Sequence, residues 1–185
     1  MDITNWLRTG AVVGAMVLAP AVSMAARLKS CLAEPATPES YTQNFSGEAT
    51  RLLNDMRYDA HKVAYHADNL ENFATNTEID WQLHADQLTR IKHEVNDMGQ
   101  RLCRLEAIEG AVAPWQRTAI RQVAPLVQYM ADNTDDAINY VNAHQGEFWV
   151  PSYSRNVQNL DTEATTVARR VHNDEEAGIH SGFGS

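Results

Sequence analysis

The feature that most constrains this sequence is a spacing of apolar or small residues, alternately three and four positions apart, that recurs in four separate runs. Such spacing places these side chains on one stripe of an α-helix. The runs are Ala49, Leu53, Met56, Ala60, Val63, Ala67, Leu70 and Ala74; Trp81, His84, Leu88, Ile91, Val95, Met98, Leu102 and Leu105; Ile120, Val123, Val127, Met130, Thr134, Ala137, Val141, His144 and Phe148; and Tyr153, Val157, Leu160, Ala164, Val167 and Val171. Four helices that bury their stripes against one another along a common seam, as coiled coils do, satisfy this pattern.

Helix-start signals divide the runs at matching places. They are a Thr-Pro pair at 37–38, a Thr and an Asp three residues apart at 77 and 80, and prolines at 114 and 151. We therefore expect helices at about 38–75, 78–109, 114–147 and 151–175. Connections this short force neighbouring helices to run antiparallel. The predicted fold is all-α, an antiparallel up-down-up-down four-helix bundle with long helices over residues 38–176, followed by a flexible tail at 177–185 that contains three glycines.

The N-terminus has the pattern of a secretory signal peptide. Arg8 precedes an apolar run at 11–26, and the small residues Ser23 and Ala25 suit the positions before a cleavage site. We expect residues 1–25 to be the leader, 26–37 to be an N-terminal extension, and the protein to be exported to the periplasm or the exterior.

Two alternatives to cleavage remain open. The leader could be retained as an anchor, although an apolar run of about 16 residues, interrupted by Pro20, is shorter than the roughly 20 that a spanning helix needs. Cys31 could carry a lipid, although Arg27 and Lys29 stand where lipid-attachment signals have small or apolar residues.

The net charge of the sequence argues against some classes of binding partner. The sequence has 15 Lys and Arg against 24 Asp and Glu, a formal net charge of -9, which repels phosphate backbones and anionic lipid heads. We expect no nucleic-acid partner and, once the leader is removed, no stable membrane insertion. The expected partner is another protein or a second copy of this chain.

The two cysteines of the sequence should meet at one end of the bundle. Cys103 is near the end of the second predicted helix, and Cys31 lies a few residues before the first. In an antiparallel pair these positions share an end, and exported proteins meet oxidising conditions. We predict a Cys31–Cys103 disulfide; the alternative is two unrelated thiols.

Two histidines occupy seam positions, His84 in the second run and His144 in the third. Inward imidazoles at one level could hold a haem iron by both axial positions, or a zinc or copper ion with help from Glu71 or Glu147. Against this hypothesis, the count from the opposite loop places them about four residues, roughly 6 Å, apart. Neither belongs to a Glu-x-x-His or His-x-x-x-His motif. The alternative is a pair of core-edge imidazoles bonded to Tyr, Asn or backbone groups.

Three seam methionines form the second candidate site. Met56, Met98 and Met130 lie about 20 residues below the same end of the bundle, and thioether sulfur selects Cu(I). The alternative is that they are adaptable filler of an irregular core.

No catalytic signature appears in the sequence. It contains no haem-attachment Cys-x-x-Cys-His, P-loop, dinucleotide fingerprint, Gly-x-Ser-x-Gly elbow or metalloprotease motif. The stretches "WQLHADQLTRIKHEVNDMGQRL", "PWQRTAI" and "NTDDAINYVN" resemble an exported helical protein type of soil acidobacteria, and this resemblance implies no activity. We expect a structural or protein-interaction module rather than an enzyme, with a haem- or metal-binding bundle as the alternative.

Overall fold

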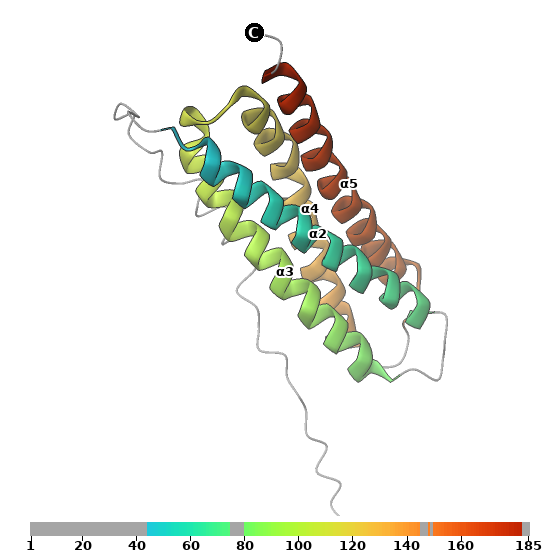
Figure 1. Ribbon diagram of the computed structural model, residues 1–185. Helices are drawn as coiled ribbons and strands as arrows, with labels where there is room; N and C mark the ends of the chain where they lie inside the picture. The colour runs from blue at the N-terminus through green and yellow to red at the C-terminus, as the bar shows by residue number, and fades with distance from the viewer. Residues whose placement is uncertain (1–43, 75–79, 145–147, 149, 183–185) are drawn as a thin grey trace, which may run out of the picture.

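The computed structural model describes residues 44–74, 80–144, 148 and 150–182, and within them the only regular structure is helical. The predicted leader and N-terminal extension lie outside the described residues. The elements are the helices α2 (Ser46–Ala74), α3 (Trp81–Ile108), α4 (Pro114–Ala143) and α5 (Pro151–Gly182), with a short 3₁₀ turn η1 (Glu109–Ala111) between α3 and α4. This arrangement confirms the predicted all-α four-helix bundle (Figure 1).

The four helices form a ring in which each packs mainly against two neighbours, whereas α2 and α4 touch little across the centre. Residue numbers run in opposite directions along neighbours. Glu48 of α2 binds Arg104 of α3 near one end, and His66 binds Gln87 towards the other. The corresponding pairs between α4 and α5 are Gln122 with Arg170 and Asn133 with Asn159. Both pairs of neighbours are therefore antiparallel.

The core lies where the spacing of apolar residues predicts it. All the predicted seam residues are buried except Ala74, Trp81 and His144. Ala74 and Trp81 are partly buried at helix ends and still pack against the core. His144 is exposed, because α4 ends at Ala143 and the chain leaves the helical path there. The prediction that the third seam continues inward through His144 is therefore wrong.

Four helix ends differ from the prediction. α2 begins at Ser46 rather than 38, and the Asn44 side chain accepts a hydrogen bond from the Ser46 N–H there. α4 ends at Ala143 rather than 147. α3 begins at Trp81 rather than 78, because the Asp80 carboxylate accepts a hydrogen bond from the Gln82 backbone N–H and caps the helix.

α5 continues to Gly182 instead of ending at 175. Its last turns pack on α4, where the indole of Trp115 lies against Gly178. The prediction of a flexible tail at 177–185 is therefore wrong as far as Gly182, and one glycine of that segment makes a packing contact.

The two ends of the bundle are built differently. At one end, which we call the Gln116 end, α2 and α4 begin and α3 and α5 finish, and the Phe45 N–H donates to the carbonyl of Ala111 (3.1 Å). At the opposite end, which we call the His84 end, α3 and α5 begin. None of the described helices is both long and apolar enough to cross a bilayer.

Candidate functional site

His84 lies one turn inside α3, is 1% exposed, and is surrounded by aromatic rings. Its Nδ1 is 2.9 Å from the hydroxyl of Tyr153 on α5. Its ring stacks on Phe148, with centroids 4.1 Å apart, and meets Phe73 of α2 edge-on at 6.0 Å. His84 therefore joins three separate parts of the chain at this end of the bundle.

Burial keeps both members of the His84–Tyr153 pair neutral. Removal from water lowers the pKa of His84 to about 4 and raises the pKa of Tyr153 above its ordinary value. A neutral imidazole carries a proton on only one ring nitrogen; we assign it to Nε2, so that Nδ1 accepts from the Tyr153 hydroxyl. This matches the alternative in which His84 is a core-edge histidine bonded to a tyrosine.

His144 does not lie in the buried site of His84. It is the C-cap of α4, is exposed, and its Nδ1 donates to the carbonyl of Tyr140 at 3.2 Å. Its ring stacks on the Tyr140 ring, which in turn lies 5.5 Å from the Tyr153 ring. The path of ring contacts from His84 to His144 thus runs through two tyrosines, and the structure does not bring the imidazoles together.

The three methionines are completely buried members of the single apolar core. Thioethers with no exposed surface fill space between helices, and the Cu(I) hypothesis stays a prediction.

Cys103 lies in the second half of α3, at the end where α2 begins, as the disulfide prediction requires. Cys103 is not a free cysteine. Cys31 lies outside the described residues, so the Cys31–Cys103 pairing stays a prediction.

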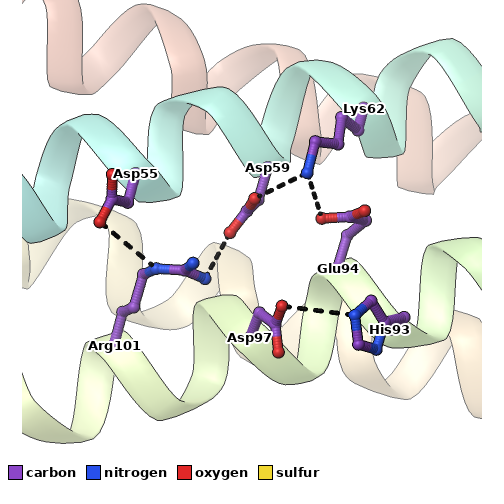
Figure 2. Close-up of polar contacts among 7 residues, drawn as sticks. All are labelled: Asp55, Asp59, Lys62, His93, Glu94, Asp97 and Arg101. Carbon is purple, nitrogen blue, oxygen red and sulfur yellow. Dashed lines mark hydrogen bonds and ion pairs between the residues drawn. The ribbon is translucent and has the colours of Figure 1, made fainter.

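A polar network between α2 and α3 was not foreseen from the sequence (Figure 2). Its centre is Asp59, which is only 3% exposed. The Asp59 carboxylate accepts from Arg101 at 2.5 Å and from Lys62 at 3.3 Å, and Lys62 also binds Glu94 at 3.0 Å. Asp59 directly precedes the seam residue Ala60 and is not itself part of the spacing pattern. The pattern therefore gives no sign that the Asp59 side chain is buried.

Charges in this network neutralise one another. Burial raises the pKa of Asp59, while Arg101 and Lys62 oppose that shift. Burial lowers the pKa of Lys62, but the hydrogen bonds and charges of Glu94 and Asp59 outweigh it and raise the pKa overall. An arrangement in which Asp59, Lys62, Glu94 and Arg101 each have a partner of opposite charge is suited to fixing how two helices pair.

Outside this network, α2 exposes two tyrosines. Tyr58 and Tyr65 are each 64% exposed, and the Lys62 ammonium lies 4.5 Å from the Tyr58 ring centroid. On α4, Tyr129 is similarly exposed. The spacing of apolar residues predicts which face of a helix is exposed, but it does not distinguish the aromatic residues on that face. These tyrosines were therefore not predicted as a site.

Within the described part of the chain, no three His, Cys, Asp or Glu side chains gather in a way that could hold a metal ion. Comparison with known proteins gives no further direction: no protein-family model, no curated protein and no solved structure matches this chain. The resemblance to the acidobacterial protein type stays a prediction.

Proposed function

We propose that this protein is an exported interaction module that binds a protein partner through the outer face of α2. The observation that carries the proposal is the pair of exposed tyrosines at 58 and 65. Seven residues span about two helical turns, so the two rings lie on one face roughly 10 Å apart.

Tyrosines of this kind are suited to recognition. A tyrosine offers a large apolar ring and a hydroxyl, loses little conformational freedom, and is enriched at binding hot spots. The α2–α3 network holds this face in place, because Lys62 contacts Asp59 and Glu94 on one side and the Tyr58 ring on the other. The face is therefore preorganised for binding.

Two further observations support binding of a partner over binding of a haem or metal. The Nδ1 atoms of His84 and His144 are each engaged by a different tyrosine, and the methionine sulfurs have no exposed surface. An absorption spectrum with elemental analysis of the protein from its native compartment tests this directly. A Soret band, or stoichiometric metal that the double variant His84→Ala/His144→Ala loses, would favour the metal-binding alternative.

Site-specific photo-crosslinking tests the interaction face. A photoreactive phenylalanine analogue is placed at position 58, 65 or 129 of the full chain in its native host. We expect one discrete adduct from positions 58 and 65 and none from position 129, an equally accessible tyrosine on α4.

Affinity provides the second measurement. With the crosslinked partner purified, Tyr58→Ala and Tyr65→Ala should each weaken binding by about 30-fold, which corresponds to a hot-spot loss of about 2 kcal/mol. Tyr129→Ala is the matched control and should bind like the wild type. Equal losses from all three variants would contradict a specific α2 face.

A further inference from the structure

His84 is the common contact of α2, α5 and the connection that precedes α5. Phe73 comes from the last turns of α2, Tyr153 from the first turn of α5, and Phe148 from the connection between α4 and α5. α4 contributes Tyr140, which packs on Tyr153 rather than on His84. One side chain thus holds three parts of the chain at the His84 end.

Among the described residues, no charged side chain forms a hydrogen bond or an ion pair with His84. Its titratable neighbours are Tyr153 and, through that ring, Tyr140. Among the described residues no carboxylate acts on the pKa of His84, for which burial is the sole cause of the shift. A proton added here would create a buried cation for which the described residues provide no counter-ion, and the nitrogen that accepts from Tyr153 would become a donor.

The Gln116 end is held by a different kind of contact. The neutral amide of Gln116 donates to the Ser46 carbonyl at 2.7 Å and to Thr50 Oγ1 at 2.8 Å. Glu48 meets Arg104 there in a two-pronged ion pair, and that arginine holds the pKa of Glu48 below its usual range. The contacts of the Gln116 amide involve no ionisable group and therefore do not change with pH.

We propose that His84 is an acid-sensitive latch, whose protonation releases its contact with Phe148 and the first turns of α3 and α5 while the Gln116 end stays packed. The latch is a property of the fold and is independent of the function proposed for α2. Its chemistry is uptake of one proton by Nδ1, with loss of the hydrogen bond that the Tyr153 hydroxyl donates.

The size of the effect follows from the two protonation equilibria. The His84 pKa is about 4 in the folded end, against 6.5 for a free histidine. Each unit of difference changes the opening equilibrium tenfold, so opening should increase on the order of 100-fold between pH 7 and pH 4.

Hydrogen exchange of the full chain, read by peptide segment and corrected for intrinsic rates, measures this opening. Segments 81–88 and 150–157 should lose protection by that factor, whereas segments 46–57 and 114–120 should change far less. His84→Gln keeps a group that accepts from Tyr153 but gains no proton, and it should abolish the acid response. His144→Gln, an exposed histidine at the same end, should retain it.

NMR titration of wild-type His84 gives a test that needs no variant. The proposal requires its midpoint to coincide with the loss of protection at the His84 end. Titration near the ordinary pKa with the end still closed would overturn it. So would acid opening that begins at the Gln116 end, or that is the same in the wild type and His84→Gln.

Discussion

The indole of Trp115 lies so close to Gly178 that a Cβ atom at position 178 would come within 2.4 Å of the Trp115 Cδ1. This contact connects the first turn of α4 to the last turns of α5. It explains why α5 continues to Gly182, because only a glycine lets the two helices approach so closely there.

Gly178→Ala should therefore destabilise the protein, even though alanine favours a helix over glycine by about 1 kcal/mol. We expect a net loss of about 1–3 kcal/mol in the free energy of unfolding, since Trp115 has to move. Urea denaturation measures the loss. Gly47→Ala is the matched control, because open space surrounds Gly47, and it should be neutral or slightly stabilising. Equal behaviour of the two variants would contradict the proposed contact.

The Asp59 network should contribute more to stability than an exposed ion pair. Asp59→Asn removes the charge that Arg101 and Lys62 share, and we expect a loss of about 1–3 kcal/mol. Arg101 and Lys62 are partly exposed and regain water, which limits the cost. The control is Asp86→Asn, which breaks the exposed i,i+4 pair with Arg90 and should cost at most about 0.5 kcal/mol. A smaller loss for Asp59→Asn than for Asp86→Asn, by urea denaturation, would refute this prediction.

These two contacts show where sequence reasoning succeeds and where it stops. A spacing of three and four fixes which face of each helix is buried, because burial of apolar area dominates folding and follows the helical period. Asp59 and His144 mark its limits. Asp59 can be buried because cationic side chains neutralise it, and the spacing of apolar residues does not show which cations lie nearby. His144 is exposed because α4 ends before it, and the position of a helix end depends on capping rather than on periodicity. His84 was located correctly, but its tyrosine partner lies on α5 and only the packing of the helices identifies it.

Glu163 should make the fold more stable in mild acid. Burial raises its pKa to about 7, with Asn133 opposing and Asp132 adding to the shift. The folded state then binds the proton more tightly than the unfolded state, whose pKa is 4.5. The stabilisation is complete below pH 4.5 and is lost as the pH rises through 7, by up to about 3 kcal/mol. Glu163→Gln should lose this dependence, as thermal unfolding at pH 5 and pH 7.5 would reveal. An unchanged profile in the variant would assign the dependence to other groups.

The predicted Cys31–Cys103 disulfide closes about 72 residues. In the chain-entropy model it should stabilise the fold by roughly 4 kcal/mol. Mass spectrometry without reductant should find the two cysteine peptides linked in the monomer, and reduction should lower the midpoint of urea unfolding. Free thiols on both cysteines would rule out the pairing.

Gln116 is the polar residue whose loss should most disturb the end opposite His84. It is 1% exposed, its amide donates to Ser46 and Thr50, and its carbonyl oxygen accepts from the Ala113 N–H at 2.9 Å. Gln116→Met keeps the volume but leaves these partners without their bonds, so we expect a loss of about 2–3 kcal/mol. Gln100→Met, at an exposed position of α3, is the control and should change stability by less than about 0.5 kcal/mol. Hydrogen exchange should place the lost protection in the first turns of α2 and α4. If the loss appears instead at the His84 end, the two ends are not held independently.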